Sequence, residues 1–591
     1  MAVLGALSGA QLALAVTLLV VVAAARELFF SPLRAFRGPV VARFTNFWRA
    51  FLTALGNVDS TTRGWHQKWG DAVRIGPNAI SLSDPSLIKV VYASTSKNAW
   101  KKGDMYRVND VVVNGQRISN IFNTQNEAFH TKFTRPIGGF WSLSKILEME
   151  PLMDETIWTF TNKLGTAFAD ATSGAEPSLC MMDDWLTYFA WDFAANVSFG
   201  RHYGFIEQGK DVEGMIAEST AGLNYFATVS QIPWLDNWLD KNPVLRIGPK
   251  PLVKGLLYTV NLVADYQKKL SDGTLERRHV ESFIDKYNGL KNVYDFADDN
   301  QIVHWLMANI LAGGDSTAGA LRPIVYYLAK RPEVQVRLQT ELQGARLSVP
   351  AQWSEVKHLA YLDAVLREAA RMSPAVGLMF ERQVPAGGFQ LPDGRFIPEG
   401  TTVGINPTVV TRDVSVFGDE VDDFRPERWL RAPQESVWNY DQRRRQMEEV
   451  TDLMFGAGSR ACMGKSLAKV EMYKLIATLY TLFHINLPDV NHEWKRRNAW
   501  FMYQHDMPMV IRRRASSAAT IPKTGPTRAC AVGTAHPVDV DVDVSVSVSD
   551  APAPAPALMV VGAGTAEDEG QGAERVEIIQ DSGAGIAELT S

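Results

Sequence analysis

The longest helix that the sequence predicts covers residues 298–330, and it constrains the fold more than any other segment. It begins with acidic residues, ends with Lys330 and Arg331, and stops before Pro332. The helix dipole stabilises acidic residues at the start of a helix and basic residues at its end, and proline ends a helix. The pattern therefore predicts a long helix with defined ends.

The middle of this helix reads AGGDST, residues 312–317. Two adjacent glycines cost a helix about 1–2 kcal/mol relative to alanine, and serine or threonine there can bond back to a carbonyl and bend the axis. Either a kink between packed helices or the close approach of a flat ligand can account for the glycines. From the helix alone both explanations stay open.

Other segments complete a mainly helical pattern. Further helices are predicted at 354–372 and 464–482, and strand-like segments lie near 72–83 and 389–403, the second with an Asp-Gly turn. The sequence therefore predicts a mainly α fold with small peripheral β-sheets.

The composition indicates a globular protein and excludes some functions. Of 591 residues 46% are hydrophobic, and the net charge of −5 shows no bias towards nucleic-acid binding. The three cysteines, Cys180, Cys462 and Cys530, are too far apart in sequence for a disulfide framework or a zinc site.

The N-terminal segment from Ala2 to Ala25 carries no charge and is long enough to cross a bilayer. Arginines follow it and no basic residue precedes it, which by the positive-inside rule places the rest of the chain in the cytoplasm. A signal peptide cleaved after residues 23–25 is the alternative, but the missing basic start argues against it. The sequence predicts an uncleaved transmembrane anchor over residues 1–27.

The C-terminal segment differs in composition from the rest. Residues 515–591 contain no Phe, Trp or Tyr, and they include VDVDVDVSVSVS and APAPAPA. Such a segment cannot bury enough apolar surface to repay the entropy of ordering. Residues 515–591 are predicted to be a disordered low-complexity tail.

The segment FGAGSRACMGKS, residues 455–466, resembles two nucleotide-binding patterns superficially. A phosphate-binding loop would need glycine where Ser459 stands, and a dinucleotide fold would need a preceding strand and a following acidic residue. Neither requirement is met. The remaining chemical feature is Cys462 as a candidate ligand.

A possible ion network involves three residues that are distant in sequence. Glu368 and Arg371 are spaced to pair on one helix face, and Arg428 lies in the Pro-bounded loop FRPERW. A surface salt bridge is the ordinary explanation for the first two. If Arg428 joins them, the three residues would form a buried structural network.

Four motifs stand in a fixed order: AGGDST (312–317), EAAR (368–371), FRPERW (424–429) and FGAGSRACMG (455–464). In this order and at this spacing they resemble the motifs of the cytochrome P450 monooxygenases, of fungal microsomal type. Residues 126–143 are similar to the pisatin-demethylase-like group. The resemblance implies the cytochrome P450 fold, with one catalytic domain over residues 28–514 behind the anchor, and a haem b cofactor.

The resemblance assigns the cysteine loop to the haem. Cys462 would be the axial ligand of the haem iron, because a thiolate donates electron density that favours O–O cleavage. Gly456 and Gly458 would let the backbone fold closely around the sulfur, and Gly464 would start the next helix.

Other residues would contact the haem from around this loop. Phe455 would pack over the ligand, and Arg460 would pair with a propionate. The family often has a basic propionate ligand where this sequence has Thr134. His130 or Arg135 would contact a propionate instead.

The helix motif would serve the oxygen chemistry. By resemblance Asp315 would relay protons and the Ser316 hydroxyl would order water, in a helix opened by the two glycines. The family usually has threonine at the place of Ser316, and Thr317 is a candidate replacement for that alcohol.

The resemblance implies an enzyme, a haem-thiolate monooxygenase that uses O₂ to hydroxylate, epoxidise or dealkylate a lipophilic small molecule. Its place would be fungal secondary metabolite biosynthesis or detoxification, in the endoplasmic reticulum membrane, with a single pass and the catalytic domain facing the cytoplasm. Electrons would come from NADPH through a separate NADPH-cytochrome P450 reductase, with cytochrome b5 as a further donor. The alternatives are a haem-thiolate isomerase or dehydratase and a non-catalytic haem-binding protein.

Overall fold

The computed structural model describes residues 9–93, 100–113, 116–170, 178–248, 253–276 and 278–514. The predicted tail, 515–591, and the first eight residues of the predicted anchor lie outside the described residues. The longer helices are α1 (Gly9–Ala25), α2 (Phe47–Leu55), α3 (Val58–Trp69), α5 (Glu127–Gly138), α7 (Glu150–Leu164), α8 (Met182–Phe199), α10 (Met215–Val229), α11 (Val253–Ser271), α13 (Asp299–Lys330), α14 (Pro332–Ala345), α16 (Ala360–Met372), α19 (Val437–Asp452) and α20 (Lys465–Leu482). Short helices include α4 (Ile88–Val91), α6 (Leu143–Leu147), α9 (Phe205–Gln208), α12 (Phe283–Asn288), α15 (Trp353–Val356), α17 (Pro407–Val410) and α18 (Val414–Phe417).

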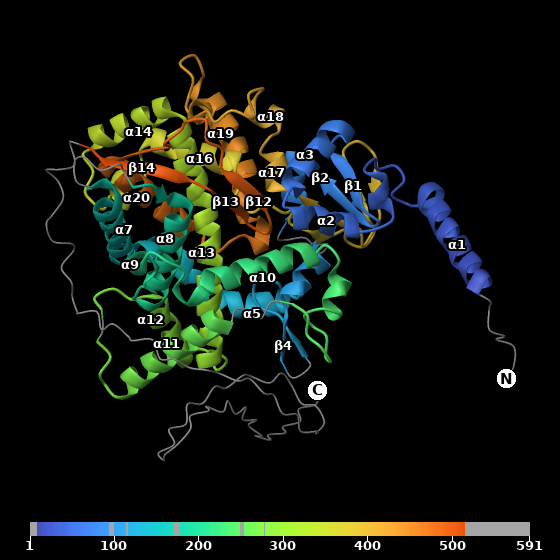
Figure 1. The fold of residues 1–591 in the computed structure, drawn as a ribbon, viewed down its shortest axis with the longest axis horizontal. Coiled ribbons are helices and arrows are strands. Elements are labelled where there is room, and N and C mark those ends of the chain that lie inside the picture. Colours follow the sequence, from blue (N-terminus) through green and yellow to red (C-terminus); the bar gives the residue numbers. More distant parts are fainter. Residues whose placement is uncertain are drawn as a thin grey trace.

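Helix α13 runs through the middle of the helical part of the molecule (Figure 1). It packs against α8, α11 and α16, and the main hydrophobic core surrounds it. Asp298 caps its start by accepting a hydrogen bond from the backbone N–H of Gln301 at 2.8 Å. The helix is continuous from Asp299 to Lys330. The structure therefore confirms the predicted helix, but the predicted opening at Gly313 and Gly314 is wrong.

The helix predicted over 354–372 is two helices, α15 and α16. The break has a local cause at the start of α16, where a carboxylate from α14 acts as a cap. Glu341 accepts hydrogen bonds from the backbone N–H groups of Tyr361 and Leu362 at 2.8 and 2.9 Å. These two donors would otherwise lack partners at a helix start, so the cap fixes where α16 begins.

In the part of the chain that the structure describes, five small sheets lie around the helices. The largest has the strand order β1 (Ala72–Gly76), β2 (Ala79–Leu82), β10 (Thr402–Ile405), β7 (Arg382–Gln383), β3 (Lys101–Lys102). The others pair β11 (Phe483–Asn486) with β14 (Pro508–Arg513) and β14 with β6 (Cys180–Met181), β12 (Lys495–Asn498) with β13 (Met502–His505), β4 (Val111–Val113) with β5 (Gln116–Ile118), and β8 (Phe389–Gln390) with β9 (Phe396–Ile397). The strands predicted near 72–83 and 389–403 are confirmed.

The N-terminal helix α1 projects from the side of the molecule that carries β1 and α2 (Figure 1). Within the described residues, no helix has both the length and the apolar character that crossing a membrane requires.

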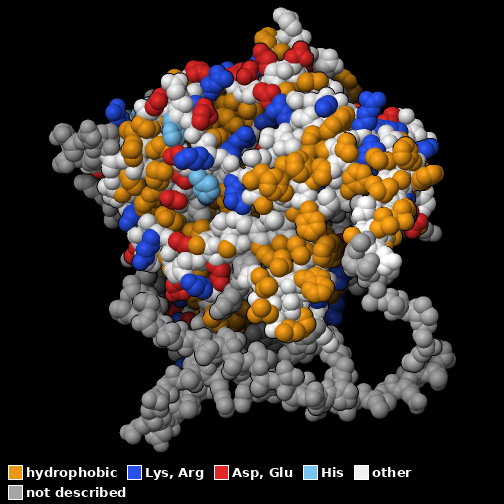
Figure 2. Space-filling model, turned by 45° about the vertical axis from the view of Figure 1, so that its right-hand side comes forward, with side chains coloured by type: hydrophobic (Ala, Val, Ile, Leu, Met, Phe, Trp, Pro, Cys, Tyr) orange, Lys and Arg blue, Asp and Glu red, His pale blue; other side chains and the backbone are white. Residues whose placement is uncertain are grey.

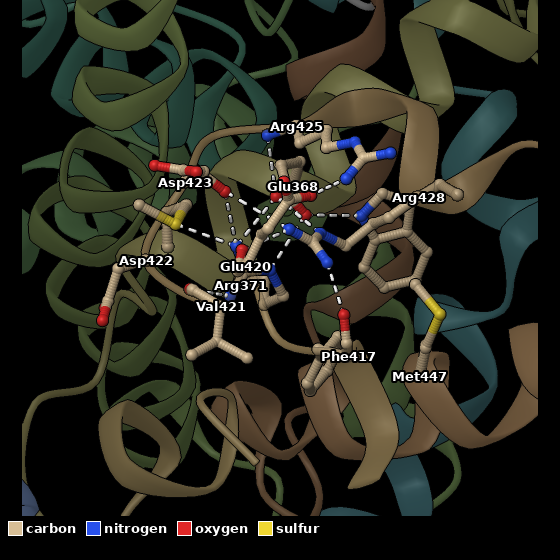
Figure 3. A network of polar contacts seen from close by, with 12 residues as sticks. Glu368, Arg371, Phe417, Glu420, Val421, Asp422, Asp423, Arg425, Arg428 and Met447 are labelled. Atoms are coloured by element: carbon tan, nitrogen blue, oxygen red, sulfur yellow. Dashed lines mark hydrogen bonds and ion pairs between the residues drawn. The ribbon is translucent and has the colours of Figure 1, made fainter. Parts of the chain in front are cut away.

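The carboxylate of Glu368 lies at the centre of a buried polar network (Figure 3). Arg371 donates to it from Nε and Nη2 at 2.9 and 2.8 Å, and Arg428 donates from Nε at 2.9 Å. The side chains of Glu368 and Arg371 are 0% exposed, and that of Arg428 is 8% exposed. The three residues expected to join therefore meet, in the interior rather than at the surface.

Two further donors complete the hydrogen bonding of the Glu368 carboxylate. The indole N–H of Trp429 and the backbone N–H of Arg425 each donate to Glu368 at 2.9 Å. Burial raises the pKa of Glu368, but the hydrogen bonds and charges of Arg371 and Arg428 outweigh it and lower that pKa below its ordinary value. The carboxylate is thus ionised and saturated with donors. No role was predicted for Trp429, although it is the last residue of the FRPERW motif.

Replacing Glu368 with glutamine should destabilise the protein strongly, because two buried guanidinium groups lose their counter-charge. Loss of one partner from a buried ion pair costs about 3–5 kcal/mol. We expect a clear drop in the midpoint of urea unfolding measured by circular dichroism. Glu420→Gln is the matched control, because Glu420 forms an exposed pair with Arg425 that contributes little. Equal midpoints for the two variants would contradict the central role of Glu368.

Candidate functional site

The loop that carries Cys462 lies between α19 and α20. The backbone N–H of Cys462 donates to the carbonyl of Phe455 at 2.7 Å and closes the loop. Gly456 and Gly458 have φ angles of 70° and 67°, which residues with a Cβ rarely adopt. Gly464 is the residue immediately before α20. The glycines therefore serve the tight path of the backbone around the cysteine.

The thiol of Cys462 sits at the N-terminal end of α20. Protein surrounds it closely enough that burial raises its pKa, while the backbone N–H groups of Gly464 and Lys465 and the charge of Lys465 act in the opposite direction. Cys462 nevertheless keeps accessible surface. Amide donors and a helix start stabilise a thiolate, and coordination to a metal ion removes the thiol proton outright. The sulfur is therefore both reachable and prepared to act as a ligand.

A cluster of basic side chains lies beside this loop. The charge of Arg460 acts on both Lys102 and His130, and the charge of Arg382 acts on Lys102. Arg460 donates from Nε to Glu127 at 2.9 Å, but its buried Nη1 has no hydrogen-bond acceptor among the described residues. The cations outnumber the nearby carboxylates, Glu127 and Glu381, and such an excess of buried positive charge is costly unless an anion joins it. The cluster therefore has the charge and the free donor that an anionic ligand requires.

Lys102 and Arg382 are members of this cluster that the sequence did not indicate. They are opposite each other on the paired strands β3 and β7. Lys102 donates to the carbonyl of Phe122, and its Nζ lies 4.0 Å from the ring centre of Tyr106. Burial and the neighbouring charges lower the pKa of Lys102 well below its ordinary value. Because 280 residues separate the two strands, only the folded register brings the two side chains together.

His130 and Arg135, the two expected propionate contacts on α5, have different surroundings. His130 is half-buried, and burial followed by the charge of Arg460 lowers its pKa to about 4. Arg135 is exposed and makes no ion pair within the described part of the chain. The geometry therefore places His130 next to the basic cluster and leaves Arg135 at the surface.

One face of α13 keeps accessible surface although the helix runs through the molecule. Ala308, Ala312, Ser316 and Ala320 recur every four residues on this face and are half-buried or exposed. The Ser316 hydroxyl donates back to the carbonyl of Ala312. Small side chains in an interior with accessible surface leave room for a flat group.

The two glycines of α13 face α8 rather than this open face. A Cβ on Gly314 would lie 2.6 Å from Nε1 of Trp191, and one on Gly313 would lie 3.1 Å from the Cβ of Ala194. The glycines therefore allow α8 and α13 to pack closely. This packing replaces the predicted helix opening as the reason for the glycine pair.

The close packing of α8 against α13 brings the indole of Trp191 into hydrogen-bond contact with Asp315. Oδ1 of Asp315 accepts from Trp191 Nε1 at 3.2 Å, and Oδ2 accepts from the Ser219 hydroxyl of α10 at 2.7 Å. Burial raises the pKa of Asp315, and the hydrogen bonds from Ser219 and Trp191 oppose that effect. Thr317 is buried at the second position after Asp315. Neither Trp191 nor Ser219 was indicated by the sequence.

The residues present fit a haem group. A reachable cysteine sulfur at a helix start can ligate iron, and the buried, unpartnered Nη1 of Arg460 can donate to a carboxylate. The basic cluster would meet the propionate edge of the ring, and the small-residue face of α13 would face its plane.

Comparisons with known proteins agree with this description. The chain matches the cytochrome P450 family over residues 39–510 and belongs to that family. It is similar to the cytochrome P450 monooxygenase cfoH of Aspergillus candidus (35% identical over 499 residues, 84% of this chain and 90% of that protein). It is also similar to the cytochrome P450 monooxygenase AFLA_114810 of Aspergillus flavus (34%, 82% and 94%) and to mpaDE of Penicillium roqueforti (34%, 81% and 55%). The predicted family, the haem cofactor and the monooxygenase class are thereby confirmed.

Substituting alanine for Gly314 should displace Trp191 and destabilise the protein, because the new methyl group overlaps the indole. Overpacking of this kind costs about 1–3 kcal/mol. The matched control is Gly222→Ala in α10, where a Cβ meets nothing within 4 Å and helix propensity improves. Thermal unfolding should separate the two variants in opposite directions. A Gly314→Ala protein as stable as the wild type would refute the close packing.

Proposed function

We propose that Cys462 is the axial ligand of the haem iron and that the enzyme oxygenates a lipophilic small molecule of fungal secondary metabolism or detoxification. The observation that carries the ligand assignment is the reachable Cys462 sulfur between two amide donors at the start of α20. Cys180, by contrast, is fully buried, and the charges of Asp183 and Asp184 raise its pKa further instead of opposing the effect of burial, so it is a poor ligand.

Different side chains of the protein would bind the haem propionates and handle water and protons. Bound haem would supply the iron centre that activates O₂ with electrons from a reductase. Arg460, Lys102 and Arg382 would bind the propionates through charge-assisted hydrogen bonds. On the other side of the ring, the Ser316 hydroxyl would hold water on the open face of α13, and Asp315 would exchange protons with that water.

An isomerase or dehydratase that consumes no O₂ is the second candidate. A buried acid and an adjacent alcohol at Asp315 and Ser316 favour oxygen chemistry, which needs protons delivered. The similar proteins described above carry monooxygenase names, and this agrees with the same choice.

Electrons would reach the haem from NADPH-cytochrome P450 reductase, with cytochrome b5 as a further donor, at the surface formed by α19 and the start of α20. Lys465 is 47% exposed there, and Arg445 is exposed. Arg443, Arg444 and Lys465 each hold an acidic partner, but Lys465 is the most exposed of the three, and Lys469 is half-buried. Lys465 and Arg445 are therefore the cations we propose for contact with an acidic partner surface.

Reduction under carbon monoxide should give the red-shifted Soret band of a thiolate-ligated haem. Cys462→Ser should lose this band, because serine does not provide a thiolate. Cys530→Ser, in the C-terminal segment, is the matched control and should keep it. A Cys462→Ser protein with an unchanged band would show that another residue ligates the iron.

We also propose that the chain is attached to the endoplasmic reticulum membrane by its N-terminal segment, with the catalytic domain on the cytoplasmic face. The uncharged stretch from Ala2 to Ala25 supports this, as does a surface of exposed apolar side chains next to it. Figure 2, which turns the N-terminal side forward, shows hydrophobic side chains gathered there. The exposed residues include Phe29, Phe30, Phe47, Phe51, Leu55, Trp234, Trp238 and Leu245.

This apolar surface joins two segments that are distant in sequence. The rings of Phe47 in α2 and Trp234 in the loop after α10 lie 6.3 Å apart, edge to face. Exposed tryptophans and phenylalanines at one place fit the interface region of a bilayer.

Tryptophan fluorescence of the full chain in vesicles tests this surface. Phospholipids with brominated acyl chains should quench Trp234 and Trp238, so that the pair Trp234→Phe and Trp238→Phe reduces the quenched fraction. Trp438→Phe is the matched control, because Trp438 is at least as exposed as the other two tryptophans but lies on α19. The same quenching in all variants would exclude contact of the apolar surface with lipid.

A further inference from the structure

The two hydrogen bonds to Asp315 come from groups of different chemistry. An indole N–H can only donate, whereas a serine hydroxyl can donate or accept. Trp191 occupies Oδ1 and Ser219 occupies Oδ2, so the two carboxyl oxygens are not equivalent. Trp191 is 1% exposed, Ser219 2% and Asp315 4%, so bulk water does not compete for these bonds.

This difference fixes where a proton can sit. A neutral Asp315 needs an acceptor for its O–H, and Trp191 offers none at Oδ1. The Ser219 hydroxyl can turn to accept from Oδ2, and it can turn back to donate once the carboxyl is ionised. The same pair of residues therefore satisfies both protonation states without moving a heavy atom.

The other charged groups near Asp315, which are Arg322 and Asp211, do not accept its proton. Arg322 lies close enough for its charge to act on Asp315, but its guanidinium donates to the carbonyl of Asp183 and to Thr187. It contributes a fixed positive field rather than a proton acceptor. Asp211 acts on Asp315 only through its charge.

We propose that Trp191 and Ser219 are positioning residues for Asp315, with Trp191 holding Oδ1 as an acceptor and Ser219 holding the exchangeable proton on Oδ2. The proposal deepens the proposed function, because it rests on Asp315 as the acid that supplies protons. Gly314 is part of the same arrangement, because only a residue without a Cβ lets the indole of Trp191 reach Oδ1 of Asp315.

Infrared spectroscopy of the holoenzyme tests the arrangement directly. Neutral Asp315 should give a carboxylic-acid carbonyl band that Asp315→Asn removes. Trp191→Phe should shift this band to higher frequency, because the carbonyl oxygen loses its donor, and Ser219→Ala should move it as well. Ser219→Thr keeps the hydroxyl and should leave the band in place, as should Trp438→Phe at the surface. A band that ignores both Trp191→Phe and Ser219→Ala, or no band assigned to Asp315, would overturn the proposal.

Peroxide release during NADPH oxidation with the reductase provides the functional readout and needs no known substrate. Loss of one ordinary hydrogen bond changes an equilibrium by about two- to tenfold, so Ser219→Ala should raise the peroxide share of consumed electrons several-fold. Ser219→Thr should stay close to the wild type. Unchanged peroxide release in Ser219→Ala, together with an effect of Asp315→Asn, would refute the role of Ser219 alone.

The carbon monoxide spectrum distinguishes a failure of the positioning proposal from a failure of the proposed function. If every variant keeps the thiolate band, an unmoved infrared band refutes the positioning of Asp315 and leaves the proposed function intact. If the wild type lacks the thiolate band, the proposed function fails, whereas the infrared result still decides how Asp315 is held.

Discussion

The close packing of α8 against α13 is the constraint on which the site depends. Gly313 and Gly314 remove the side chains that would keep the helices apart, and Trp191 occupies the space above Gly314. This contact turns one face of α13 towards α8 and leaves the Ala312 and Ser316 face with accessible surface. One helix thereby carries both the buried acid and, on a neighbouring face, the accessible surface that can receive a flat cofactor.

Some buried charged groups in this protein are fully paired within the chain, and others are not. The fully paired network is structural, whereas the incompletely paired cluster belongs to the candidate site. Glu368 is saturated by donors from Arg371, Arg428 and Trp429, so that network is complete without any ligand. Around Arg460 the balance is opposite, because cations outnumber carboxylates and a buried nitrogen has no acceptor among the described residues. Unpaired buried charge is costly, and its presence here is consistent with an anionic cofactor edge.

The motifs, and the helices and strands that carry them, could be predicted from the sequence. Features of the site that depend on tertiary packing could not. The order of the four motifs identified the family, and helix 298–330 lies where it was predicted, because caps and proline are local signals. From the helix alone the glycine pair fitted either helix packing or a flat ligand, and the opening that the resemblance implied was wrong, since one helix cannot reveal which partner packs on it. Lys102 was missed because only strand pairing places it opposite Arg382.

A crystal structure of the haem-loaded protein would show whether the Cys462 loop and the basic cluster hold one haem against the small-residue face of α13. We expect a bond from iron to the sulfur of Cys462 and propionates within hydrogen-bond distance of Arg460, Lys102 and Arg382. Iron bound to another side chain, or propionates that point away from this cluster, would contradict it.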